Sequence, residues 1–405
     1  MKYALLICDG MADYPLEKLQ GKTPLQVADT PNLNRIAREG ATGLAVTIPE
    51  NMMPGSDVAA LSILGYDPRR YYRGRGPLEA VSLDIQPAPD EVVFRCNLVS
   101  VSDGLMQDYS AGHISTKEAR VLIEALNKEM KVEGVTFYPG VSYRHVTTIK
   151  ESLLQDGKGE LHCVPPHAII GRPIEPNLPA GQGSLLLREL MEKSREILSA
   201  QPVNQVKIDL KENPANMIWL WGGGKLDRPP SFREKFGVEG TVIAAVDLIK
   251  GIGKLIGLRV VNVPGATGYY DTDYDAKASF AIDALDKGDF VLVHVEAADE
   301  AGHNADILQK IAAIERFDAK IVGSLMAKLE EWKEYRVMVM PDHYTPISVR
   351  DHTPEPVPFA VCGKDIPADG VQAFDEFTVK EGSLKRVEGH RLMSILFGKE
   401  VNVWL

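Results

Sequence analysis

Six acidic or imidazole side chains stand beside continuous apolar runs in this sequence: Asp9, Asp299, His303, Asp342, His343 and His352. The runs are YALLIC, FVLVHV, YRVMVM and VPFAVC. Mixed carboxylate and imidazole ligands suit Zn²⁺ or Mn²⁺ better than a dedicated Ca²⁺ or Mg²⁺ cage. Two metal ions about 3.5–4 Å apart need roughly this many ligands. The set therefore predicts a two-metal centre.

Each of these residues also has an ordinary structural explanation when it is taken alone. Asp9 with the following glycine is typical of a turn, and Asp299 with His303 has the spacing of one helix face. A single histidine such as His352 can be a hydrogen-bonded core residue. Their joint occurrence at the ends of three or four separate strands favours the metal centre.

Ser56 lies in the stretch MPGSDVAALSILGY, where a Pro-Gly pair precedes a run with the pattern of a buried helix. A serine in this position commonly caps the helix by accepting a backbone hydrogen bond. The free amides of a helix N-terminus also bind phosphate. Beside two metals, Ser56 would be a nucleophile that carries a phosphoryl group.

Short apolar runs alternate with amphipathic segments through most of the chain. This alternation predicts an α/β fold with a mostly parallel sheet sandwiched by helices. Ligands of such sheets bind beyond the carboxyl ends of the strands, which is where the six residues above fall.

The pattern changes between residues 81 and 211, where strand-like and helical runs surround a Pro/Gly-rich stretch. We expect an inserted smaller α+β domain at 81–211 and a core domain formed by 1–80 and 212–405. VNQVKIDL is expected to be a strand of the inserted domain, and the core is expected to resume near NMIWLWGGGK.

Composition limits the partners and the compartment. The formal charge is −11, with 45 Lys+Arg against 56 Asp+Glu, which disfavours nucleic acid and favours a small ligand. The apolar runs are too short for membrane helices, and MKYALLICDG is interpreted as a first strand and not as a signal peptide. Four scattered cysteines favour a reducing cytoplasm. Nothing in the sequence indicates an oligomeric state.

Several motifs together resemble a known superfamily. The order of Asp9, PGSD, DEAGH, PDH and DHTPEPVPF resembles the alkaline-phosphatase superfamily. The chain is more closely similar to the archaeal type of cofactor-independent phosphoglycerate mutases, from DGMADYP and TPNLNRIAREG through GYDPRRYYRGRGPLEA and AGHIST to the last histidine. This resemblance implies an alkaline-phosphatase-like core whose inserted domain closes over the substrate and excludes water.

The resemblance also implies the reaction and the ligands. One metal would lie on Asp299, His303 and His352, and the second on Asp9, Ser56, Asp342 and His343. Ser56 would accept the phosphoryl group of 3-phosphoglycerate and return it as 2-phosphoglycerate, a step of glycolysis and gluconeogenesis. The metals would be two divalent ions, Mn²⁺, Zn²⁺ or Co²⁺ with Mg²⁺ left open, and 2,3-bisphosphoglycerate would not be required.

A phosphoglycerate mutase also needs cations for the substrate carboxylate. The candidates are Arg75, Arg95, Arg144 and Lys277, each of which has a surface ion pair as its alternative role. His113 would protonate a leaving hydroxyl or bind phosphate.

The stretch DYSAGHIST departs from the resemblance. It has Tyr109, Ser110 and His113 where the archaeal mutases carry arginines, and it is similar to a branch proposed to act as homoserine kinases. The alternatives are therefore a kinase-like enzyme acting on an amino-acid hydroxyl and a phosphomonoester hydrolase. A metal-stabilised binding protein would keep the histidines without needing Ser56.

Overall fold

The computed structural model describes residues 1–399 and divides the chain into two compact units. The core unit consists of Met1–Tyr72 and Arg228–Leu405, and the inserted unit is Arg73–Asp227. The boundaries therefore differ from the predicted ones, because the inserted unit begins before residue 81 and ends after residue 211.

Two elements account for the difference at the boundaries. Helix α5 (Arg75–Ser82) and strand β7 (Met217–Gly224) both belong to the inserted unit. β7 contains MIWLWGGG and pairs antiparallel with β3 (Glu91–Ser102), so this apolar run completes the inserted sheet and does not begin the core again. The expected strand VNQVKIDL is also wrong, because it lies in helix α8 (Pro202–Asp209).

The core unit is built on an eight-stranded sheet. Its strand order is β13 (Lys385–Glu388), β2 (Ala41–Val46), β12 (Val357–Gly363), β11 (Tyr335–Met340), β1 (Lys2–Cys8), β10 (Phe290–Val295), β8 (Gly240–Ile243) and β9 (Arg259–Val261). Only β12 runs antiparallel to its neighbours in this sheet. The predicted mostly parallel sheet is confirmed.

Helices cover both faces of the core sheet, as predicted. On one face Ala4, Leu6, Val291 and Val293 share a hydrophobic core with α2 (Pro31–Glu39), α11 (Tyr274–Lys287), α13 (Ile307–Arg316) and α14 (Gly323–Trp332). On the other face Val242 packs against α10 (Asp247–Leu255), and Tyr3 contacts Phe397 just after α15 (Leu392–Leu396). The shorter helices of this unit are α1 (Pro24–Val27), α3 (Ser56–Ile63), α4 (Pro68–Tyr71), α9 (Phe232–Phe236) and α12 (Ala297–His303).

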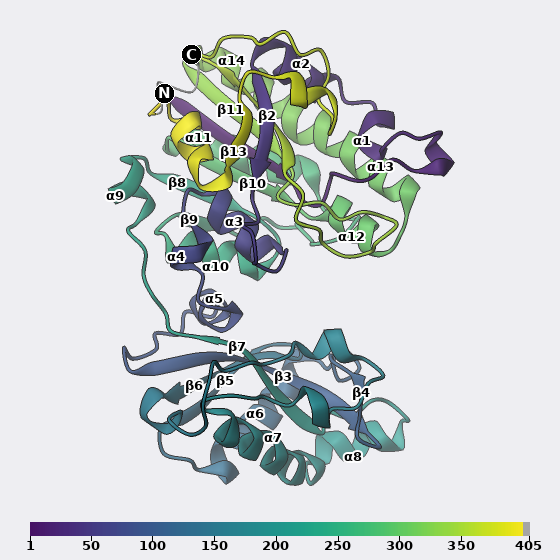
Figure 1. Cartoon of the computed structure of the whole chain (residues 1–405), viewed down its shortest axis with the longest axis vertical. Coiled ribbons are helices and arrows are strands. Elements are labelled where there is room, and N and C mark those ends of the chain that lie inside the picture. Colours follow the sequence, from purple (N-terminus) through teal and green to yellow (C-terminus); the bar gives the residue numbers. More distant parts are fainter. Residues whose placement is uncertain (400–405) are drawn as a thin grey trace. The chain divides into compact units, whose positions relative to one another are not determined.

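The inserted unit has an antiparallel sheet of its own (Figure 1). Its order is β4 (Leu105–Asp108), β3, β6 (Arg144–Lys150) and β5 (Val135–Val141). β7 also pairs with β3, along the edge opposite β6. Helices α6 (Thr116–Met130) and α7 (Ser184–Ser199) pack against this sheet. α6 begins with the expected capping box of Ser115 and Glu118. Within residues 1–399, every helix is too short or too polar to cross a bilayer.

A buried ion pair connects two loops of the core unit to α13. Lys310 Nζ lies 2.7 Å from Asp13 Oδ2, and both side chains are fully buried. The same ammonium donates to the carbonyl oxygen of Thr345, 2.8 Å away, in the loop after β11. The pair thus holds the chain segments that follow β1 and β11 next to each other.

We expect Lys310→Met to lower the free energy of unfolding by about 3–5 kcal/mol, because it leaves the carboxylate of Asp13 buried without its cation. Urea unfolding measures the change. The matched control is Lys320→Met, since Lys320 pairs with Asp275 at 3.2 Å with both side chains more than half exposed. That control should cost less than about 1 kcal/mol. Equal losses for both variants would show that burial of the Asp13 pair is unimportant.

Candidate metal centre and phosphoryl-transfer site

Neighbouring strands bring the predicted ligands to one edge of the core sheet. β1 lies between β10 and β11 and is parallel to both, with Ile7 opposite His294 on one side and Met340 on the other. The carboxyl ends of the three strands therefore meet. Asp9 directly follows β1, Asp342 and His343 follow β11, and β10 leads into α12, which carries Asp299 and His303.

The first group of donor atoms comes from α12 and the loop before β12. His303 Nε2 lies 3.2 Å from Asp299 Oδ2 and 3.1 Å from His352 Nε2, while His352 Nε2 lies 3.4 Å from Asp299 Oδ1. His303 Nδ1 lies 3.0 Å from the carbonyl oxygen of Arg350, so Nδ1 carries the hydrogen and Nε2 is free to be a ligand. Two ring nitrogens and a carboxylate this close together fit a shared cation.

The second group comes from the loops after β1 and β11. His343 Nε2 lies 3.5 Å from Asp9 Oδ1 and 3.4 Å from Asp342 Oδ2. Both of these oxygens are buried and have no hydrogen-bond partner among the described residues. Burial and the neighbouring carboxylates of Asp342 and Asp299 raise the pKa of Asp9 well above its usual range. Buried carboxylates gathered in this way need a cation, and a divalent metal fits.

His343 belongs to both groups. Its ligand atom lies within 4.8 Å of those of Asp9 and Asp342, and also within 4.8 Å of those of Asp299 and His352. Burial is the main cause that lowers its pKa to about 4, which keeps the imidazole neutral, as a ligand must be. The two predicted sets of ligands therefore adjoin at His343, whose ligand atom lies near both.

Ser56 does not cap α3. The residue at the N-cap position is Gly55, no side chain caps this helix, and Ser56 is its first residue. Its Oγ lies instead 3.1 Å from His343 Nε2. Of the two roles considered from the sequence, helix capping is therefore excluded. The Ser56 hydroxyl lies instead beside the second group of donors, at the start of a helix.

Gly10 allows the close approach of the strand ends. Its φ is +61°, and a Cβ atom on it would lie 2.7 Å from Asp299 Oδ1 and 2.6 Å from Thr345 Oγ1. Gly10 also donates its N–H to Asp342 Oδ1 at 3.2 Å. The turn explanation for the Asp-Gly pair is therefore correct, and the same turn places Asp9 beside the other carboxylates.

Three of the predicted substrate-binding cations gather in the inserted unit. The Arg95 and Arg75 guanidinium groups lie 5.0 and 5.8 Å from the centre of the Trp221 ring. Burial lowers the pKa of Arg95, and the charges of Arg75 and Arg144 add to this while Glu79 opposes it. We call Arg75, Arg95 and Arg144 the arginine cluster.

The arginine cluster has unused donors. The Nε atoms of Arg95 and Arg144 are buried and lack a hydrogen-bond partner within residues 1–399. Glu79 Oε2 lies 3.9 Å from Arg95 Nε, which is too far for a hydrogen bond. Neighbouring guanidinium groups with buried donors of this kind suit an anion such as a carboxylate or phosphate.

The stretch DYSAGHIST lies beside this cluster. The rings of Tyr109 and His113 contact that of Tyr143, with centroids 5.5 and 6.3 Å away, and the Arg144 guanidinium lies 5.9 Å from the same ring. His113 is exposed and has a φ of +52°. The predicted proton donor His113 and Arg144 of the arginine cluster therefore lie around the same tyrosine ring.

Lys277 differs from the prediction. It is completely buried in the core unit, its Nζ lies 2.9 Å from Glu296 Oε2, and it donates to the carbonyl oxygen of His294. An ammonium held by these two groups is not available to a substrate. Lys277 instead keeps a carboxylate charged beneath the metal centre.

Two site residues were not found from the sequence. Thr345 donates its hydroxyl to Asp299 and lies 3.2 Å from His343 Nδ1, so it orients a candidate ligand of each group. His294 lies inside the run FVLVHV and is fully buried next to Asp9 and Asp342. A polar residue within an otherwise apolar strand was the available signal for His294.

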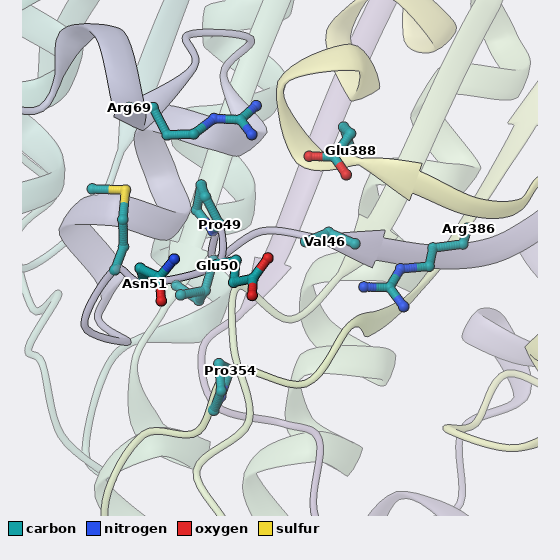
Figure 2. A pocket seen from close by; sticks show the side chains of 10 residues that line it. Val46, Pro49, Glu50, Asn51, Arg69, Pro354, Arg386 and Glu388 are labelled. Carbon is teal, nitrogen blue, oxygen red and sulfur yellow. The ribbon is translucent and has the colours of Figure 1, made fainter.

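A cavity of the core unit, of about 430 Å³, is a separate feature (Figure 2). It is lined by residues of the loop that precedes Ser56 and by Pro354, Arg69, Arg386 and Glu388. None of the six candidate ligands lines it, and the guanidinium of Arg69 is bound to Asp67 through two nitrogens. The chemistry above therefore does not take place in this cavity.

Comparisons with known proteins agree with this geometry. A family model described as 2,3-bisphosphoglycerate-independent phosphoglycerate mutase matches residues 37–204. A protein of that name from Methanothrix thermoacetophila is 50% identical over 397 residues, covering 98% of this chain and 99% of the relative. The chain belongs to the family of 2,3-bisphosphoglycerate-independent phosphoglycerate mutases. A probable member of this mutase family from Geobacter sulfurreducens is 47% identical and covers 98% of this chain and 100% of its own.

Solved structures share the fold of this chain. A cofactor-independent phosphoglycerate mutase from Thermoplasma acidophilum is 29% identical, with a TM-score of 0.66 and coverage of 98% of this chain and 100% of the other. A Pyrococcus horikoshii protein is 28% identical, with a TM-score of 0.81 and coverage of 98% and 96%. The similarity to the mutase family thus extends across both units.

Proposed function

We propose that the protein interconverts 3-phosphoglycerate and 2-phosphoglycerate through a phosphoserine on Ser56, without 2,3-bisphosphoglycerate. The observation that carries this proposal is the position of Ser56 Oγ, 3.1 Å from His343 Nε2 at the start of α3, among two groups of candidate metal ligands. Full-length relatives that are about half identical and carry the mutase name support the same substrate.

Ser56 Oγ attacks the phosphorus of 3-phosphoglycerate. As the bond from phosphorus to serine oxygen forms, the serine hydroxyl gives up its proton. The bond to the 3-oxygen of glycerate breaks, and that oxygen takes up a proton. The bound glycerate then reorients, and its 2-hydroxyl attacks the phosphoserine and regenerates the free serine. The N-terminal amides of α3 favour the phosphorylated side chain through both steps.

We propose two divalent ions for the two groups of donors, one on Asp299, His303 and His352 and the other on Asp9, Ser56, Asp342 and His343. When bound, the ions neutralise phosphoryl oxygens and lower the pKa of the attacking hydroxyl. The imidazole-rich ligand set favours Mn²⁺, Zn²⁺ or Co²⁺ over Mg²⁺.

We propose that the arginine cluster binds the anionic substrate and that His113 protonates the leaving hydroxyl. We further propose a cytoplasmic location, since Cys8, Cys96, Cys163 and Cys362 are all free thiols and three of them are buried.

The direct test is ³¹P NMR of the Mn²⁺-loaded protein with 3-phosphoglycerate and no bisphosphoglycerate. We expect the signal of 2-phosphoglycerate to appear until equilibrium is reached, with little inorganic phosphate. Release of phosphate as the main product would instead indicate a hydrolase. Inertness toward phosphoglycerate together with phosphorylation of homoserine in the presence of ATP would indicate the kinase-like alternative.

We expect Arg144→Met to raise KM for 3-phosphoglycerate by about 10–100-fold, because a charge-assisted hydrogen bond contributes roughly 1.5–3 kcal/mol. The value of kcat should fall less, since Arg144 is assigned to binding. Steady-state kinetics measures both constants. The control is Arg195→Met, whose guanidinium pairs with Glu192 at 3.3 Å on the surface of the same unit. An unchanged KM in Arg144→Met would show that the arginine cluster does not bind the substrate.

A further inference from the structure

His294 lies directly beneath the carboxylates of the second donor group. In the parallel sheet, Ile7, His294 and Met340 are register partners, so their side chains point to the same face. Two positions further on, just beyond the strand ends, come Asp9, Glu296 and Asp342. The His294 imidazole therefore lies next to two candidate metal ligands, with the carboxylate of Glu296 on its other side.

Glu296 determines which nitrogen of His294 carries the hydrogen. His294 Nδ1 lies 3.3 Å from Glu296 Oε1, and that oxygen also accepts the backbone N–H groups of Ala245 and Val246 at 3.1 and 3.3 Å. The other oxygen of Glu296 is bound by Lys277 Nζ. A carboxylate surrounded by these donors is ionised and accepts from Nδ1–H. In the neutral imidazole that binds metal, Nε2 of His294 presents a lone pair on the opposite side of the ring.

That lone pair faces Asp9 and Asp342. His294 Nε2 lies 3.7 Å from Asp9 Oδ2 and 3.7 Å from Asp342 Oδ2, which is too far for hydrogen bonds. His294 Nε2 and Asp342 Oδ2 are both buried and lack a hydrogen-bond partner among residues 1–399. Donors that share one tetrahedral ion at bond lengths near 2.1 Å lie about 3.4 Å apart. His294 Nε2 thus lies close to ligand spacing from an oxygen of each carboxylate, and one of these, Asp342 Oδ2, is also 3.4 Å from His343 Nε2.

We propose that His294 is a further ligand of the metal bound by Asp9, Asp342 and His343, with Glu296 and Lys277 as the residues that orient its ring. The arrangement is a carboxylate–histidine–metal chain, in which the second nitrogen of a metal-binding histidine donates to a carboxylate. In this arrangement the buried ion pair of Lys277 and Glu296 has a role, because it fixes the carboxylate that orients the His294 ring. The inference rests on the metal dependence in the proposed function, but not on the substrate.

The test measures metal binding and not turnover. Full-length protein is stripped of metal and titrated with Mn²⁺, and free Mn²⁺ is followed by electron paramagnetic resonance. We expect the wild type to bind two equivalents, and His294→Gln to bind one of them at least ~10-fold more weakly. Glu296→Gln should weaken the same equivalent by a smaller factor. The matched control is His145→Gln, because His145 is a fully buried strand histidine in the inserted unit.

Counting nitrogen ligands separates coordination from a merely structural role. Protein labelled with ¹⁵N only in histidine is prepared in a His303→Ala background, which weakens the first metal group. The remaining Mn²⁺ should couple to two histidine nitrogens, from His343 and His294, and to one when His294→Gln is added. A single coupling without the second substitution would overturn the proposal, and this count does not depend on a folded His294 variant.

The outcomes also distinguish this inference from the proposed function. If His294→Gln loses one metal equivalent and the wild type does not turn over phosphoglycerate, His294 is a metal ligand but the proposed mutase activity is refuted. Wild-type affinity for both equivalents in His294→Gln, in a protein that is an active mutase, would refute the ligand alone.

Discussion

Ser56→Ala should reduce kcat for phosphoglycerate interconversion by about 10⁴-fold or more, because it removes the only oxygen that can carry the phosphoryl group in the proposed reaction. The variant should retain its fold, since the side chain makes no capping hydrogen bond in α3. Mass spectrometry of the wild type quenched with substrate should show one added phosphoryl group, and this addition should be absent from the variant.

A second serine at a helix start provides the control. Ser231 accepts the backbone N–H of Glu234 and caps α9, so Ser231→Ala should cost about 1 kcal/mol of stability without a change in kcat. Substantial turnover by Ser56→Ala would mean that the phosphoryl group does not pass through this serine.

Removal of metal should have the second large effect. We expect a chelator to lower activity by at least ~10³-fold, because the phosphoryl charge is then left without its main counter-charges. It should also lower the thermal midpoint by several degrees, since each site filled at 100 times its Kd contributes about 2.7 kcal/mol. Calorimetry and activity of the same stripped sample measure both effects.

Adding back ions tests the ligand chemistry. Mn²⁺ or Co²⁺ should restore activity and the thermal midpoint, whereas Ca²⁺, which prefers oxygen ligands, should not. Full activity in a sample with less than one-tenth of an equivalent of metal would contradict the two-metal centre. So would complete rescue by Ca²⁺, because imidazoles supply several of the proposed ligands.

The core could be predicted because its strands are continuous apolar runs with polar residues at their ends. Asp9, Asp299 and Asp342 follow strands that are buried on both faces, and such strands are recognisable without knowledge of their partners. The sheet to which a run belongs was not predictable in this way. MIWLWGGG has the composition of a core strand, but its backbone pairs with β3 of the inserted unit.

The error at VNQVKIDL has a local cause. Its apolar residues partly alternate, which indicates a strand, but Pro202 stands at the first position of a helix. The Asn204 side chain donates to the carbonyl oxygens of Leu198 and Ala215 and accepts from the Ala215 N–H. These tertiary hydrogen bonds hold α8 in place, and no periodicity in the sequence reports them.

The types of residue in the site could be predicted from the sequence, but the contacts that each of them makes could be predicted less well. Lys277 was expected at the substrate because basic residues near a phosphate site commonly bind it, yet its charge is used inside the core. His294 was overlooked because a strand residue between valines is expected to be core. The decisive information is the partner in space, which is Glu296 for Lys277, 19 positions away, and Asp9 and Asp342 for His294.

The insertion of Arg73–Asp227 into the core has a consequence for how the enzyme is made. The ribosome produces Asp9 and Ser56 first and the complete inserted unit next, and only afterwards the strands that lead to Asp299, Asp342 and His352. At ordinary rates of synthesis the serine waits on the order of half a minute for the remaining ligands. Under the proposed mechanism, the nascent chain therefore holds its nucleophile before the proposed metal ligands have all been synthesised.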